Sequence, residues 1–165
     1  MKKIVLYRSK TGFTKKYADW IAEVLECEAK PISKRAIEEA KSCDVIIYGS
    51  GLMGNMIMGL NKVLGLNGKL VIFATGASRA SDELVDTIKN QNKLNEHPFF
   101  YMQGGLKLEE VGLVKRKMLS MVQKSFAKKP DKTEDEAYMA EAMTKSFDAT
   151  NRKYIAPLIG YVKEL

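Results

Sequence analysis

The chain has 165 residues, of which 45% are hydrophobic, and it carries a formal charge of +7 at neutral pH. This length and apolar content suit one compact domain, and no apolar run approaches the roughly 20 residues that a membrane-spanning helix needs. Two cysteines and one histidine are too few for an ordinary structural zinc site, so no bound metal is expected. The first residues run directly into an apolar segment without the features of a signal peptide, which favours a cytoplasmic location.

A strand, a hydroxyl-rich loop and a helix are predicted first along the chain. Lys3–Arg8 is a short apolar run typical of a buried strand, and residues 15–25 form an amphipathic helix pattern. The loop between them reads Ser9-Lys10-Thr11-Gly12-Phe13-Thr14. Hydroxyl groups, a glycine and a helix N-terminus together favour an anion, and the absence of a Walker lysine or a G-x-G-x-x-G motif favours a single phosphate monoester. The alternative is an ordinary loop in which Thr14 caps the helix.

Predicted strands and helices then alternate as far as residue 102. The strands are expected at 28–32, 44–49, 69–74 and 98–102, and the helices at 34–42, 56–66 and 82–90. Pro31 cannot donate a ladder hydrogen bond, so the second strand should lie at an edge of the sheet. Strands separated by helices indicate a doubly wound α/β fold, with a parallel sheet and helices on both faces.

The loop 9–14 resembles the phosphate loop of flavodoxins, whose pattern is roughly S/T-x-T-G-x-T. The resemblance implies a flavodoxin-like, five-stranded parallel sheet of order 2-1-3-4-5 and FMN as the cofactor. In that family the first loop holds the FMN phosphate, and the loops after the third and fourth strands flank the isoalloxazine ring. The cofactor-binding residues implied here are Ser9, Lys10, Thr11, Gly12, Phe13, Thr14, Ser50, Gly51, Leu52, Met53, Gly54, Thr75, Gly76, Ala77 and Ser78. No catalytic acid or base is identified, because the flavin would carry the chemistry.

The residues of the two ring-flanking loops predict how tightly a flavin ring would be bound. The loop 50–55 has glycines that allow close approach to a ring, but it lacks the tryptophan or tyrosine that often stacks there. Leu52 and Met53 would offer only apolar and sulfur contacts, which predicts weak ring binding and easy loss of the cofactor. Arg79 would stabilise negative charge on the ring if it points inward, and it is otherwise a solvated surface residue.

Residues 105–165 are expected to form a helical extension of the same single domain, 1–165. A basic helix is predicted at 111–128, a capping box at Thr133–Glu136 begins a second helix that runs to Phe147, and a final helix at 154–164 covers the sheet. The basic helix has an apolar stripe at helical spacing. This stripe either packs on the sheet or, with the basic residues between Lys115 and Lys129, forms a docking face for anionic lipid or an acidic partner.

The Met- and Lys-rich extension resembles the flavodoxin subgroup that contains the menaquinone-dependent protoporphyrinogen dehydrogenases, FMN enzymes that work beside the membrane. Three functions follow. The favoured one is FMN-based electron transfer with a redox partner protein or a small-molecule donor or acceptor such as a quinone. The second is an enzyme that oxidises a porphyrinogen-like substrate and passes electrons to quinone. The third is a non-catalytic interaction module; nucleic-acid binding is not expected, because no nucleic-acid motif is present.

Overall fold

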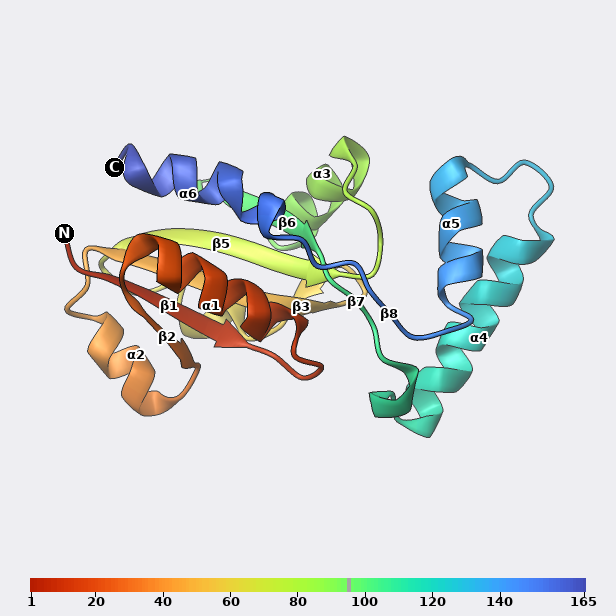
Figure 1. The fold of residues 1–165 in the computed structure, drawn as a ribbon, viewed down its shortest axis with the longest axis horizontal. Helices are drawn as coiled ribbons and strands as arrows, with labels where there is room; N and C mark the ends of the chain where they lie inside the picture. The colour runs from red at the N-terminus through yellow and green to blue at the C-terminus, as the bar shows by residue number, and fades with distance from the viewer. Residues whose placement is uncertain (95) are drawn as a thin grey trace.

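A parallel sheet forms the centre of the computed structural model, which describes residues 1–94 and 96–165. Its strands are β1 (Lys3–Arg8), β2 (Glu28–Pro31), β3 (Val45–Met53), β5 (Lys69–Gly76) and β6 (Phe99–Gln103). They lie in the order β2-β1-β3-β5-β6, which confirms the predicted 2-1-3-4-5 arrangement and the edge position of the strand that contains Pro31 (Figure 1). The middle strands are continuous apolar runs because helices cover both faces of the sheet.

Two apolar cores lie on opposite faces of the sheet. Helices α1 (Phe13–Leu25) and α6 (Ala156–Lys163) pack on one face, where they share a core with Val5 and Phe73. Helices α2 (Lys34–Ala40) and α3 (Asp82–Gln91) pack on the other face, around Ile46 and Ile72. The predicted doubly wound α/β class is therefore confirmed, and the carboxyl ends of β1, β3 and β5 are brought together at one edge.

The segment 50–66 differs from the predicted loop and helix. Strand β3 continues through Met53 and turns back into the short strand β4 (Met56–Ile57), and only a 3-10 turn, Leu60–Lys62, follows. Gly54 and Gly59 adopt φ values of 59° and 77°, which a continuous helix cannot contain. The Asn92 amide also accepts from the Ile57 N–H at 2.8 Å and donates to the Asn55 carbonyl at 2.7 Å, which holds the hairpin.

The extension after β6 is a helical hairpin on a two-stranded base. Helices α4 (Leu113–Lys128) and α5 (Glu134–Ala142) contact each other, and Figure 1 shows them beyond the end of the sheet. The predicted capping box at Thr133–Glu136 is confirmed. The expected continuation of the helix to Phe147 is wrong, because β8 (Phe147–Asp148) pairs with β7 (Gly105–Leu106) to form the base. Short 3-10 turns at Leu108–Glu110 and Arg152–Ile155 complete the connections.

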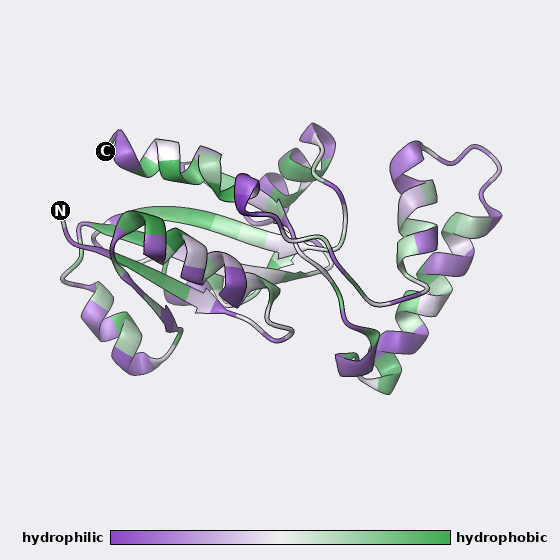
Figure 2. Cartoon of the chain, viewed as in Figure 1, coloured by the Kyte–Doolittle hydropathy of each residue, from purple (hydrophilic) through white to green (hydrophobic). Residues whose placement is uncertain are grey.

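Helix α4 does not pack on the sheet, so that expectation is wrong. No residue of this helix is buried, and Val114, Met118 and Met121 are 78%, 60% and 65% exposed. Figure 2 shows apolar and strongly polar residues interleaved along it. Helix α5 contacts α4, but within α4 only Leu119, Gln123 and Phe126 are partly shielded, and the rest of the helix is exposed. Within the described part of the chain, no helix combines the length and apolar character that a membrane crossing requires.

Candidate functional site

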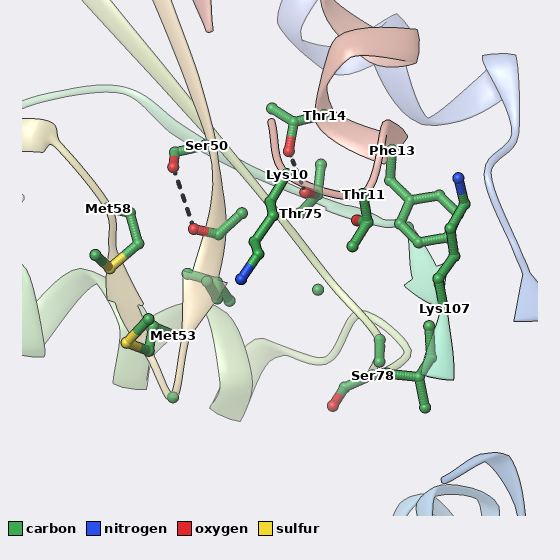
Figure 3. Close-up of a pocket in the computed structure, with 18 of the residues that line it drawn as sticks. Lys10, Thr11, Phe13, Thr14, Ser50, Met53, Met58, Thr75, Ser78 and Lys107 are labelled. Atoms are coloured by element: carbon green, nitrogen blue, oxygen red, sulfur yellow. Dashed lines mark hydrogen bonds between the residues drawn. The ribbon is translucent and has the colours of Figure 1, made fainter. Parts of the chain in front are cut away.

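A cavity of about 400 Å³ opens where β1, β3 and β5 end (Figure 3). Of the residues predicted to bind a cofactor, all except Ser9 and Gly12 line it. The structure therefore brings three segments together that are separated by about 40 and 25 residues in the sequence. The cavity is further lined by Arg8, Asn55, Met58, Leu84, Tyr101, Gly104, Gly105, Leu106, Lys107, Val111, Lys115, Leu119 and Met143.

The first wall of the cavity is the loop before α1. Gly12, at φ 93°, is the residue at which the helix begins, so Thr14 lies inside the first turn and does not cap it. No described side chain caps this end, and its first turn has no acidic residue. The Ser9 hydroxyl accepts from the Gly12 N–H at 3.1 Å, which closes the loop on itself. The remaining first-turn N–H groups and the positive end of the helix dipole are therefore available to bind an anion.

A hydrogen bond between two buried threonines joins this loop to the sheet. Thr14 and Thr75, 3% and 5% exposed, approach to 2.7 Å between their hydroxyl oxygens. A Cβ on Gly51 would lie 3.8 Å from the Thr14 hydroxyl, so the glycine keeps this floor of the cavity open. When Thr75 donates in the pair, the Thr14 proton is free to donate to a ligand.

The loop after β5 is held from beneath and from the side. The Tyr101 hydroxyl donates to the Ser78 carbonyl at 2.6 Å, and burial raises the pKa of this phenol, so it remains a donor. The Gln103 amide donates to the Ala77 carbonyl at 3.0 Å. The Arg79 guanidinium lies 4.0 Å from the centroid of the Tyr138 ring of α5. Arg79 thus faces the extension and does not line the cavity, contrary to the inward orientation considered above.

The charge around the cavity is entirely positive among the described lining residues. Arg8, Lys10, Lys107 and Lys115 line it, and no aspartate or glutamate does. Of these four, only Lys10 was predicted from the sequence. Lys107 and Lys115 come from the extension. The sequence marks the start of the extension by the Gly104-Gly105 pair, which ends the alternation of strands and helices, but nothing in it places these two lysines at the cavity. An acid-free cavity with several cations attracts anionic ligands.

Comparisons with known proteins give one matching family model and several similar solved structures. The family model described as the flavodoxin domain matches residues 4–134. No curated protein matches the sequence significantly. A flavodoxin from the domain Archaea aligns with 17% identity and a TM-score of 0.44, over 88% of this chain and 100% of that chain. A WrbA-like flavodoxin from Agrobacterium tumefaciens has 16% identity and a TM-score of 0.43, over 86% and 94% of the two chains.

Flavodoxin 2 from Bacillus cereus, in its oxidised form, aligns with 15% identity and a TM-score of 0.42, over 87% of this chain and 96% of that chain. The family assignment itself depends on the match of the family model, which spans most of the sequence. The sheet order and the loop at the end of β1 are those that the sequence resemblance implied. The chain therefore belongs to the flavodoxin-domain family.

Proposed function

We propose that the protein binds FMN in the cavity at the ends of β1, β3 and β5 and acts in electron transfer. The observation that carries the proposal is the combination of an uncapped, acid-free helix N-terminus with a cavity whose charged lining residues are all basic. A volume of about 400 Å³ falls within the range of small-molecule and cofactor sites. The donor set therefore fits a phosphate monoester attached to a large ring.

The chain's own residues would divide the binding work. The backbone N–H groups of the loop 9–14, with the Thr11 and Thr14 hydroxyls, would hold the phosphate. The segments 51–54 and 75–78 would flank the ring, and the hydrogen bonds that Tyr101 and Gln103 donate to carbonyls of the second segment would keep that segment rigid. Bound flavin would supply the one- and two-electron chemistry. Met53 is 55% exposed at the cavity rim, so one edge of the ring would remain accessible to a redox partner.

A titration of the purified protein with FMN tests this function. We expect FMN to bind with a dissociation constant of about 1 µM or below and to show a changed visible flavin spectrum, because the ring leaves bulk water for the cavity. The modest affinity follows from the ring-flanking segments, which contain no tryptophan or tyrosine. The measurement is fluorescence and the visible spectrum, with riboflavin and FAD compared. Failure to bind FMN at tens of micromolar would leave a flavodoxin-fold interaction module.

A second function is an enzyme of the protoporphyrinogen dehydrogenase type. The observation that favours it is the mouth of the cavity, where Val111, Leu119 and Lys115 from the extension meet the ring-flanking segments. Such a mouth suits an apolar substrate that carries carboxylates. Stopped-flow reduction of the bound FMN separates the two functions. An enzyme would be reduced by a porphyrinogen and reoxidised by a quinone, whereas a carrier would respond to a redox protein.

The exposed face of α4 supports a peripheral membrane contact by a cytoplasmic protein. The helix contains no acidic residue, and its exposed stripe of Val114, Met118 and Met121 is flanked by Lys117, Lys124 and Lys128. Apolar and basic residues in this arrangement lie well at an anionic lipid surface. Each lysine near such a surface contributes about 1 kcal/mol.

Vesicle flotation provides the corresponding prediction. We expect binding to vesicles that contain phosphatidylglycerol and none to phosphatidylcholine alone. The double variant Lys117→Gln, Lys124→Gln should weaken binding about tenfold or more. The matched control, Lys34→Gln with Lys62→Gln, makes the same charge change away from α4 and should leave binding nearly intact. Equal binding by both double variants, or none by the natural chain, would contradict the lipid contact and favour an acidic protein partner.

A further inference from the structure

We infer that Lys107, contributed by the extension, is the cation that makes the flavin site select a phosphorylated ligand. The inference rests on the proposed function, because it assigns a residue to the phosphate end of the same site. The resemblance between the loop 9–14 and flavodoxins does not involve this residue, which follows the last strand of the sheet. In this protein the phosphate loop and the extension would form the phosphate site jointly.

The position of the Lys107 ammonium group carries the argument. Its Nζ atom lies 5.6 Å from the centroid of the Phe13 ring, and a Cβ built on Gly12 would lie 3.8 Å from it. The ammonium therefore sits beside the backbone at which α1 begins, where the free N–H groups converge. Figure 3 shows the Lys107 side chain alongside Phe13, whereas Lys10 extends toward the β3 side of the cavity. Lys107 and Lys10 thus serve different ends of the cavity.

The backbone that carries Lys107 is anchored to the phosphate loop. A Cβ on Gly105 would lie 2.8 Å from Cζ of Phe13, so the Phe13 ring packs directly against the chain of β7. Strand β7 is paired with β8, and the Lys16 ammonium of α1 lies 3.1 Å from the Asp148 carboxylate at the end of β8. The loop and the extension are consequently held together from both sides. Because the backbone that carries Lys107 is already fixed, little backbone conformational entropy is lost when a ligand binds.

The present partner of Lys107 is one that a phosphate can replace. Its Nζ lies 3.3 Å from the Glu110 carboxylate, and the two side chains are 37% and 42% exposed. An ion pair this exposed contributes little to stability. Lys107 can therefore exchange the single charge of the Glu110 carboxylate for a phosphate group that carries nearly two negative charges. Apart from Lys10, which extends toward the β3 side of the cavity, the groups of the phosphate loop are neutral amides and hydroxyls, so Lys107 adds a charge-assisted hydrogen bond at this end. Its contribution depends on the phosphate and should vanish for riboflavin, which has the same ring.

The ratio of the FMN and riboflavin dissociation constants tests the inference in the full-length chain. Lys107→Gln should weaken FMN binding about tenfold and riboflavin binding less than twofold. Lys107→Arg keeps the charge and should retain most of the ratio. The matched control is Lys124→Gln, which removes a lysine of α4 that does not line the cavity, and it should behave as the natural chain. Thermal unfolding of each variant reports whether the fold is intact.

Four results would overturn the inference. If Lys107→Gln weakens FMN and riboflavin equally, the lysine shapes the cavity and does not read the phosphate. If it changes neither, or if Lys107→Arg loses the ratio as completely as Lys107→Gln, the cation is not used. If the natural chain binds riboflavin as tightly as FMN, the site recognises the ring alone and the flavin function survives. If the natural chain binds neither FMN nor riboflavin, the proposed function itself fails. This failure is seen in the natural chain and does not depend on any variant.

Discussion

Replacing Gly105 with alanine is expected to lower the free energy of unfolding by about 3 kcal/mol and to weaken FMN binding. A Cβ at this position would lie 2.2 Å from the Phe147 carbonyl oxygen and 2.8 Å from the Phe13 ring. The Phe147 carbonyl belongs to the backbone of β8, so β7 and β8 must separate before the methyl group fits. That separation would displace Phe13 from the phosphate loop and Lys107 from its position beside it. Urea unfolding and an FMN titration measure the two effects.

Gly112→Ala is the matched control for this prediction. It also lies in the extension, but an added Cβ would meet nothing within 4 Å, and its φ of −59° suits any residue. We expect a change in unfolding free energy of about 0.5 kcal/mol or less and unchanged FMN affinity. If Gly105→Ala is as stable as Gly112→Ala, the base of the extension tolerates opening and does not hold the phosphate loop.

The sheet could be predicted from the sequence because its strands are buried on both faces. Val45–Met53 and Lys69–Gly76 begin as continuous apolar runs, which local patterns report reliably. The strand order came from the family resemblance, and the structure confirms it. Lys10, Thr11, Phe13 and Thr14 of the loop 9–14 line the cavity because the position of the loop after β1 is fixed by that topology.

The parts that the sequence could not predict depend on residues distant in the chain. The segment 56–66 contains apolar residues compatible with a helix, but Asn92 holds it as a hairpin through side-chain hydrogen bonds. The stripe on α4 has a helical period, yet a period shows which residues share a face and not what that face contacts. Lys107 is close to Gly12 only because β7 returns along the phosphate loop. None of these contacts has a local signature.

The Thr14→Ala variant is expected to show the largest loss of FMN affinity, about thirtyfold, together with a decrease of 1–2 kcal/mol in unfolding free energy, at roughly the cost of an unpaired buried hydroxyl. Its hydroxyl is the 2.7 Å partner of Thr75, and both side chains are buried. The substitution therefore removes a donor to the phosphate and leaves the Thr75 hydroxyl without its partner. Thr14→Ser keeps the hydroxyl and should restore both the affinity and most of the stability.

Thr11→Ala separates binding from stability at the same loop. Thr11 is partly exposed and makes no hydrogen bond through its side chain to another described residue, so its removal should leave the unfolding free energy within about 0.5 kcal/mol. FMN affinity should fall about tenfold, because one hydrogen bond to a charged group is lost, while riboflavin affinity stays constant.

Equal FMN binding by Thr14→Ala and the natural chain would mean that the Thr14 proton is committed to Thr75, and that amides and Thr11 alone hold the phosphate.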